Sequence, residues 1–288
     1  MPELPEVETM VRGIRGHVIE RTINDVVQCP NECKPNPLSP AFKLFRKRLI
    51  GQRFSGAKRL GKRVVLTLSD DSTLVIEPRM TGLVLLSDPP DVEHLRLRWD
   101  FDGPGNYHSF WFWDRRGLGT VRLFSASQFQ ELVESGKLGP DALEMTPTRW
   151  KEQLGHLKRE IKTVLLDQKV VAGIGNLYAS EILHLAAISP SVIASSLSPQ
   201  MIGRLADAAQ TVLSTAIEHE GSTLGDGTYR TALNKSGGYQ NLHRVYMKAG
   251  KPCPTCASGK IVRIVQSQRS TFFCPICQKS PKKVGSKS

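Results

Sequence analysis

Two closely spaced cysteine pairs near the C-terminus constrain this chain more than any other feature. Cys253 and Cys256 form the first C-x2-C pair, and Cys274 and Cys277 form the second after seventeen intervening residues. Each pair can hold one side of a tetrahedral Zn²⁺ ion while the residues between them form a β-hairpin. Because four thiolates leave no open coordination position, the pattern predicts one structural zinc ion per chain. Two redox dithiols or an iron–sulfur site are the alternatives.

The positive charge of the chain is unevenly distributed. The formal net charge is +12, and the stretch 43–63 holds nine basic residues and no acidic one: Lys43, Arg46, Lys47, Arg48, Arg53, Lys58, Arg59, Lys62 and Arg63. Residues 279–288 add four lysines. Composition alone fits a generally basic surface equally well, but clustering of the charge favours a polyanionic partner, nucleic acid first.

Length and hydrophobic patterning limit the classes of protein to which this chain can belong. The chain has 288 residues, enough for two domains. It holds no run of about 18 apolar residues, which predicts no membrane span. The acidic opening lacks the apolar core of a signal peptide, so we expect a cytosolic protein. In the cytosol the default for Cys29 and Cys33 is a pair of free thiols without a role.

The periodicity of apolar residues changes along the chain. A short helix is expected after Pro5, with Gly16 as its stop, because apolar residues recur there at helical spacing. Residues 18–124 alternate strand-like segments with turn residues, the pattern of a β-sandwich or barrel. Helical patterns follow at 125–135, at 159–167, after Asn176 as a candidate cap, and after Ser198. The stretch 219–250 is rich in Gly, Ser, Thr and Asn, as functional or mobile loops often are.

Pro2 is a candidate nucleophile. Removal of Met1 would leave Pro2 with a secondary amine, which can attack an aldehydic sugar carbon and form an iminium ion. That cation withdraws electrons and acidifies the neighbouring C–H bond, so that β-elimination can break a nucleic-acid strand. Glu3 and Glu6 lie beside Pro2 at a helix N-terminus, where carboxylates are favoured. Taken alone, this opening is more often an ordinary helix start.

Three motifs along the chain resemble those of the formamidopyrimidine-DNA glycosylase family. The first is Pro-Glu-Leu-Pro-Glu-Val-Glu at 2–8. The second, Asp-Gln-Lys-Val-Val-Ala-Gly-Ile-Gly-Asn-Leu-Tyr-Ala-Ser-Glu at 167–181, is similar to the family's helix–two-turn–helix signature. The third is the four-cysteine segment with Gln-Arg-Ser-Thr-Phe-Phe at 268–273. The motifs stand in the family's order and span essentially the whole chain.

The resemblance implies a catalytic set of Pro2, Glu3, Lys62 and Arg269. Pro2 would be the nucleophile, and Glu3 the acid that assists opening of the sugar ring. Lys62 would reach the damaged site and its phosphate from a hairpin, and Arg269 would hold a phosphate from the zinc hairpin. In isolation, Lys62 and Arg269 would be solvated surface groups.

The resemblance also implies a set of DNA-binding residues. Asn176 would hold a phosphate from a turn between helices, and His94 would be a further contact. Extrusion of a base leaves a gap that an apolar wedge must fill. Met80 matches the family's wedge, Arg116 matches the arginine that faces the orphaned base, and Leu118 stands where the family usually has phenylalanine. Met80 alone would more often be a core residue.

The sequence departs from the family pattern at several positions. Glu77 and Pro78 replace the usual histidine and leucine, the cysteine spacing is one residue longer, and a basic tail follows Cys277. Together with Leu118, these departures bear on lesion preference and on the geometry of the wedge. None of them touches Pro2, Glu3 or Lys62.

The expected architecture is α+β: an N-terminal β-sandwich with a short N-terminal helix, then a helical helix–two-turn–helix domain with a zinc-bound β-hairpin. We expect a catalytic sandwich domain at 1–135, a DNA-binding domain with a lesion-capping loop at 141–250, a four-cysteine zinc finger at 251–278 and a basic tail at 279–288.

The family resemblance implies a bifunctional DNA glycosylase and abasic-site lyase of base excision repair. Such an enzyme excises 8-oxoguanine and formamidopyrimidines and cleaves the strand by β,δ-elimination through an N-terminal proline Schiff base. The expected partner is double-stranded DNA with oxidised bases or abasic sites, bound by a cytoplasmic, nucleoid-associated monomer. Two alternatives remain. One is a relative resembling endonuclease VIII that prefers oxidised pyrimidines. The other is a non-catalytic nucleic-acid-binding zinc protein, which would have no need of Pro2, Glu3 and Lys62 together.

Overall fold

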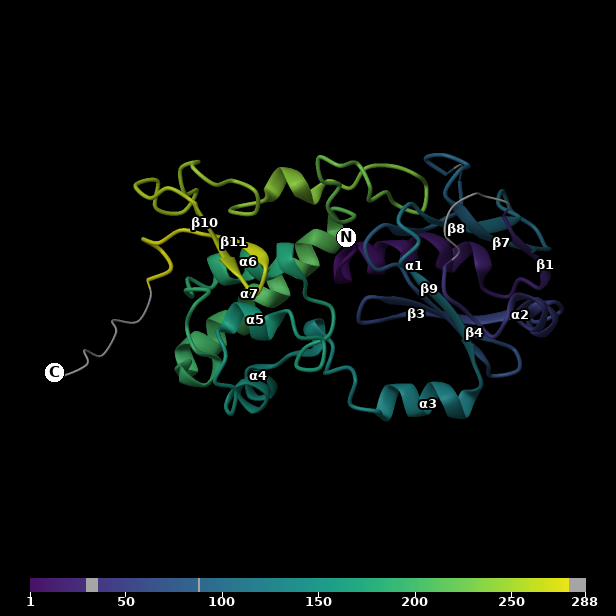
Figure 1. Cartoon of the computed structure of the whole chain (residues 1–288), viewed down its shortest axis with the longest axis horizontal. Coiled ribbons are helices and arrows are strands. Elements are labelled where there is room, and N and C mark those ends of the chain that lie inside the picture. Colours follow the sequence, from purple (N-terminus) through teal and green to yellow (C-terminus); the bar gives the residue numbers. More distant parts are fainter. Residues whose placement is uncertain (30–35, 88, 280–288) are drawn as a thin grey trace. The chain divides into compact units, whose positions relative to one another are not determined.

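A computed structural model describes residues 1–29, 36–87 and 89–279 (Figure 1). Contacts divide the chain into two compact units. Unit 1 comprises Met1–Lys137 together with Ala216–Asn241, and unit 2 comprises Leu138–Thr215 and the chain from Leu242 onward. Residues 216–241 thus pack with the N-terminal residues and not with the rest of the domain expected at 141–250. Cys33 and almost all of the basic tail lie outside the described residues.

Unit 1 is the predicted β-sandwich. One sheet has four strands in the order β1, β7, β8, β6, which span Ile23–Gln28, Leu95–Phe101, Ser109–Asp114 and Gly82–Leu85. The other has five strands in the order β2, β9, β5, β4, β3, which span Leu38–Ser39, Thr120–Phe124, Thr73–Glu77, Arg63–Leu68 and Phe54–Leu60. Among these strands every pairing is antiparallel except that of β2 with β9.

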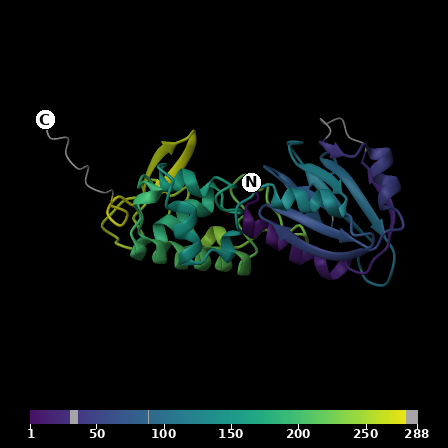
Figure 2. The same ribbon diagram turned by 90° about the horizontal axis from the view of Figure 1, so that it is seen from below.

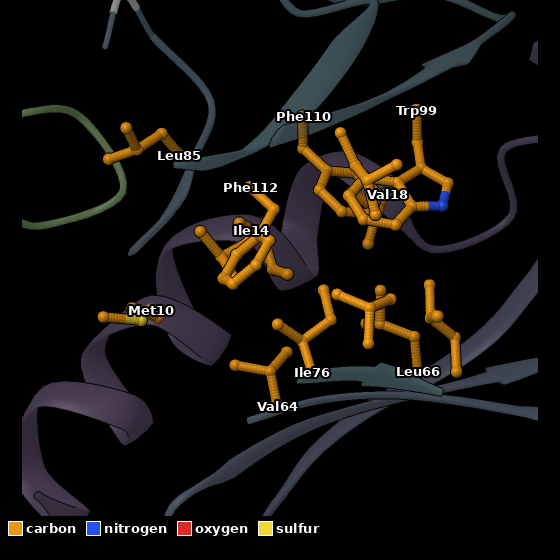
Figure 3. Close-up of a cluster of buried hydrophobic side chains, with 14 of the residues drawn as sticks. Met10, Ile14, Val18, Val64, Leu66, Ile76, Leu85, Trp99, Phe110 and Phe112 are labelled. Carbon is orange, nitrogen blue, oxygen red and sulfur yellow. The ribbon is translucent and has the colours of Figure 1, made fainter. Parts of the chain in front are cut away.

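The core of unit 1 lies between the two sheets and is completed by helix α1 (Figure 3). Helix α1 contributes Met10, Ile14 and Val18 to this cluster. The five-stranded sheet contributes Val64, Leu66 and Ile76, and the four-stranded sheet contributes Leu85, Trp99, Phe110 and Phe112. The rings of Trp99 and Phe110 stack 4.6 Å apart. Burial of this set anchors α1, and with it the N-terminus, to the sandwich.

Helix α1 spans Leu4–Val18, so the predicted helix exists but does not stop at Gly16. A Cβ atom at Gly16 would meet no atom from another part of the chain within 4 Å, whereas Val18, two residues later, is fully buried. The burial of Val18 therefore outweighs the weak helix propensity of one glycine.

Two further helices accompany the sandwich. Helix α2, Phe42–Leu49, was not predicted, because its basic residues were interpreted only as a charge cluster; Phe45 and Leu49 are its buried face. Helix α3, Ala126–Glu134, matches the helix expected at 125–135 and is capped by the Ser125 hydroxyl, which accepts the Gln128 N–H.

Unit 2 is helical and carries a two-stranded hairpin, as expected. Its helices are α4 at Pro147–Leu154, α5 at Ile161–Leu165, α6 at Asn176–Leu185 and α7 at Pro199–Glu218, the last of which runs on into unit 1. Strands β10, Val262–Gln266, and β11, Arg269–Phe273, pair antiparallel and form the hairpin beside these helices (Figure 2). Helix α5 is shorter than the predicted 159–167. Among the described residues no helix has the length and apolarity needed to span a membrane.

Candidate functional site

The four predicted zinc ligands lie together at the base of the β10–β11 hairpin. Their sulfur atoms are all within 4.8 Å of one another. The Sγ–Sγ distances are 3.7 Å for Cys253–Cys277 and 3.8 Å for Cys256–Cys274. A tetrahedron with Zn–S bonds of about 2.3 Å has edges of about 3.8 Å, so the four donors fit one zinc ion with no open position. A Cβ atom on Gly259 would lie 2.7 Å from the Cys274 sulfur, so the close turn requires glycine.

Helix α6 holds the segment that leads into the zinc cluster. The Glu181 carboxylate is fully buried and accepts three backbone N–H groups, from Arg244 at 2.8 Å, Val245 at 3.0 Å and Tyr246 at 2.7 Å. Burial raises the pKa of Glu181, and the three donors act in the opposite direction. One turn later, His184 Nε2 lies 3.4 Å from Cys253 Sγ. Burial, reinforced by Arg244, lowers the pKa of His184 to about 4.

Asn176 and the zinc hairpin are held together by a buried lysine. The Asn176 amide donates to the Ser270 carbonyl at 3.0 Å, next to the exposed Arg269. Lys162 is only 1% exposed, and its Nζ donates to Asn176 Oδ1 at 2.8 Å and to Thr271 Oγ1 at 3.1 Å. Two predicted phosphate ligands of unit 2 are therefore positioned by one network.

The expected helix cap at Asn176 is corrected by the structure. The cap residue of α6 is Gly175, and Asn176 is the first helical residue, its side chain turned to the hairpin. Lys162 was missed because it lies in an apolar helical stripe; a lysine at a core position of that stripe was the available signal.

The start of α1 is built around Glu6. Pro2 and Glu3 are buried, and Glu3 is the cap residue of the helix. Glu6 Oε2 accepts the Glu3 N–H at 2.9 Å, and its Oε1 accepts the Ser222 N–H at 2.9 Å. One carboxylate thus joins the predicted nucleophile segment to the glycine-rich loop. Gly221 has a φ of +77° and would place a Cβ 2.9 Å from Glu6 Oε1, so the loop requires glycine at this point.

Lys62 occupies the turn between β3 and β4. Leu60 pairs with Arg63 across this turn, and Gly61 adopts a φ of +57°. Arg59 donates from Nη1 to the Gly61 carbonyl at 3.0 Å and from Nε to the Glu8 carboxylate at 3.1 Å. Since Glu8 lies on α1, Arg59 fixes the Lys62 turn relative to the helix that begins with Leu4.

Three predicted DNA-binding residues of unit 1 share one support. The buried Asp114 carboxylate accepts the Thr81 hydroxyl at 2.5 Å and the Gly119 N–H at 2.8 Å, and the Thr81 oxygen accepts the Arg116 N–H at 2.9 Å. This network brings together the loops that carry Met80, Arg116 and Leu118. Met80 is 36% exposed and Leu118 is 39% exposed. Neither side chain is therefore part of the hydrophobic core, which was the alternative for Met80.

His94 lies in the turn before β7, and its backbone carbonyl accepts the Asp114 N–H at 3.0 Å. Asp91 Oδ1 accepts the His94 backbone N–H at 2.9 Å and lies 2.8 Å from the ring Nδ1. The same oxygen accepts the Trp113 indole N–H at 3.1 Å. Because a carboxylate can only accept a hydrogen bond, Nδ1 carries the ring hydrogen and donates it to Asp91.

The predicted residues are distributed over both units. Unit 1 carries Pro2, Glu3, Lys62, Met80, His94, Arg116 and Leu118, and unit 2 carries Asn176, Arg269 and the four cysteines. Within unit 1, hydrogen-bond networks centred on Glu6, Arg59 and Asp114 hold the segments that carry these residues. From sequence, Glu6 was noted only as an acid near Pro2 and Arg59 only as part of the basic cluster, and Asp114 was not singled out.

The chain matches three family models, one after another along its length. Residues 1–121 match the formamidopyrimidine-DNA glycosylase N-terminal domain, residues 138–227 its H2TH domain, and residues 250–279 the zinc finger found in FPG and IleRS. A formamidopyrimidine-DNA glycosylase of Chloroflexus aggregans is 38% identical over 282 residues, covering 96% of this chain and 98% of the relative. One of Bacillus cereus is 36% identical, with coverage of 96% and 99%.

Solved structures of similar proteins contain DNA. The Lactococcus lactis Fpg protein in complex with abasic-site DNA matches with a TM-score of 0.84 at 30% identity, covering 96% of this chain and all of that one. A mutant of the same protein bound to Fapy-dG DNA matches with a TM-score of 0.85 at 31% identity, with coverage of 97% and 100%.

Proposed function

Because the chain belongs to the formamidopyrimidine-DNA glycosylase family, we propose that Pro2, Glu3 and Lys62 carry out base removal and strand cleavage in one active site. The protein is a DNA glycosylase of base excision repair that binds damaged double-stranded DNA and carries one structural zinc ion. The observation that carries the residue assignment is the start of α1, where buried Pro2 and Glu3 are fixed by Glu6 and, through Glu8 and Arg59, joined to the Lys62 turn.

Loss of Met1 frees the Pro2 nitrogen, which attacks C1′ of the damaged nucleotide. The bond from C1′ to the base breaks, and the base leaves with the bonding electrons and takes up a proton. Glu3 gives a proton to the ring oxygen as the sugar opens, leaving an iminium ion between C1′ and Pro2. Loss of a C2′ proton then expels the 3′ phosphate, and a second elimination expels the 5′ phosphate. Lys62 pairs with the phosphate at the damaged site.

Residues on several separate elements bind the DNA. Asn176 and Arg269 hold the backbone from α6 and the zinc hairpin, and Lys62 and His94 hold it from unit 1. Met80 fills the space of the extruded base while Arg116 faces its orphaned partner, with Leu118 as the second apolar group. The exposed side chains of Met80 and Leu118 support this assignment, since a wedge must be available to the duplex. We infer a monomer that acts in the cytoplasm at the nucleoid, where its substrate is.

The choice of lesion is tested by comparing two duplexes, one with 8-oxoguanine and one with an oxidised pyrimidine. We expect faster release of 8-oxoguanine and products that carry phosphate on both sides of the gap, because both eliminations occur. Single-turnover assays of base release and of strand ends measure this. Preferential release of the pyrimidine would instead assign the protein to the substrate class of endonuclease VIII.

Replacement of Met80 by alanine should slow base excision from duplex DNA by roughly tenfold, because the extruded state loses its apolar support. Cleavage at a pre-formed abasic site should slow less, since extrusion is easier there. Val92→Ala is a matched control, since Val92 is another exposed apolar residue of unit 1. Equal slowing on the two substrates would point to a packing role for Met80.

Replacement of Arg269 by glutamine should weaken binding to all DNA sequences alike. The salt dependence of binding should flatten by about one unit, because one phosphate contact is lost. Titrations at several salt concentrations measure the slope, and Arg263→Gln, on the paired strand β10, is the control. A loss of affinity confined to one sequence context would mean that Arg269 contacts a base.

A further inference from the structure

His184 lies between the zinc cluster and Arg244, and no step of the reaction uses it. It sits on the last turn of α6 and is 3% exposed. One ring nitrogen, Nε2, lies 3.4 Å from Cys253 Sγ, and the other, Nδ1, lies 3.2 Å from Arg244 Nε. The ring therefore bridges a metal ligand and a cation through its two nitrogens.

Arg244 determines which ring nitrogen carries the hydrogen. A guanidinium group has donors only, so His184 Nδ1 must accept the Arg244 Nε–H. The hydrogen of the neutral ring is then on Nε2, which faces the sulfur. The contact between His184 and Cys253 is thus an N–H···S hydrogen bond with a defined direction.

Arg244 cannot easily leave this position. Its Nη2 donates to Thr255 Oγ1 at 2.8 Å, and its backbone N–H donates to Glu181 Oε2 at 2.8 Å. Thr255 in turn donates its own backbone N–H to Cys253 Sγ at 3.4 Å. Cys253 therefore receives two N–H donors, one from within its own C-x2-C turn and one from α6.

We propose that His184 is a positioning residue of the zinc centre, which donates a hydrogen bond to the Cys253 thiolate and thereby slows loss of the metal. Four thiolates give the Zn²⁺ site a net charge of −2, and an N–H donor draws negative charge away from one sulfur. A thiolate with less negative charge is less readily protonated or oxidised, the two routes by which zinc leaves such a site. Partners of this kind typically change metal affinity by about 10–100-fold.

The same contact fixes the zinc hairpin to α6. Asn176 at the first residue of α6 holds the hairpin through Ser270, and His184 at the other end holds the first cysteine turn. Helix α6 thereby supports the segment that carries Arg269 at two separate points, and loss of either support should loosen it.

The test uses the full-length, zinc-loaded protein with His184→Phe, which keeps a ring of similar size but removes the donor. Zinc release to excess chelator, and release during hydrogen peroxide treatment, should be about tenfold faster. His184→Gln, whose amide can still donate, should restore much of the retention. His156→Phe, at an exposed histidine of unit 2, should behave as the wild type.

Cobalt substitution separates a hydrogen bond from simple packing. In protein loaded with Co²⁺, the sulfur-to-cobalt charge-transfer bands of His184→Phe should shift to lower energy, because the sulfur electrons are less stabilised, and His184→Gln should shift less. Faster zinc release with unmoved bands would assign His184 to packing and overturn the proposal, as would wild-type release in His184→Phe.

Arg244→Leu gives a second route if His184→Phe does not fold. It leaves α6 unchanged but removes the donor that fixes the ring, so faster zinc release is again expected, and unchanged release contradicts the proposal. These measurements report on the metal and not on DNA cleavage, so their failure would leave the proposed function standing.

Discussion

Protein that retains Met1 should bind damaged DNA but lose strand cleavage by a factor on the order of 1,000 or more. Retention of Met1 ties the Pro2 nitrogen into a peptide bond, whose electrons are delocalised into the carbonyl and do not attack a carbon. The new terminal amine lies one residue further out, whereas Pro2 and Glu3 are buried at the start of α1. Single-turnover cleavage of an abasic-site duplex measures the loss, with protein made while methionine removal is inhibited.

Two controls belong with this experiment. The processed protein should be fully active, and processed Pro2→Gly should retain slow cleavage, because a primary terminal amine can still form an imine. DNA affinity should be similar in all three, since Lys62, Asn176 and Arg269 are unchanged. If the Met1-retaining protein cut as fast as the processed one, Lys62 would have to form the covalent intermediate.

Cys274→Ser should lose zinc and DNA affinity together. Cys274 is fully buried in the small core of the hairpin with Val245, Ile261 and Phe272. Without the metal this core is too small to keep the hairpin folded, and Arg269 loses its fixed position. We expect zinc content to fall from about one ion per chain to near zero. Affinity for an abasic-site duplex should fall by about 100-fold.

Elemental analysis and DNA titration on the same preparation measure both effects. Cys29→Ser is the matched control, because Cys29 directly follows β1 and lies outside the cysteine cluster. It should keep both zinc and affinity. Wild-type protein stripped of zinc that still binds DNA with full affinity would contradict the structural role of the metal.

Local features of the fold were predictable because they depend on local sequence. The apolar spacing after Pro5 predicted α1, the strand-like segments and turn residues of 18–124 predicted a β-sandwich, and the spacing of the cysteines predicted the zinc cluster, all of which the structure confirms. Helix α2 was missed because four of its eight residues are basic and conceal the apolar pair Phe45 and Leu49.

Contacts between distant parts of the chain could not be predicted. The Glu6 carboxylate accepts the N–H of a residue 216 positions away, and the Lys162 ammonium donates to the hydroxyl of a residue 109 positions away. The sequence contains no signal for such partners, because they depend on how helices and loops pack, not on spacing along the chain. The same holds for residues 216–241, whose composition predicted a loop but not that the loop packs with unit 1.

The most direct test of the mechanism is covalent trapping of the intermediate. Borohydride added during turnover reduces an iminium ion to a stable amine, so the processed protein should become linked to the DNA strand. Peptide mapping should then place the link on residue 2, with DNA attached to the Pro2 nitrogen, and protein with a blocked N-terminus should give no adduct although it still binds DNA. An adduct on Lys62, or equal trapping when the N-terminus is blocked, would contradict the assignment of Pro2 as the nucleophile.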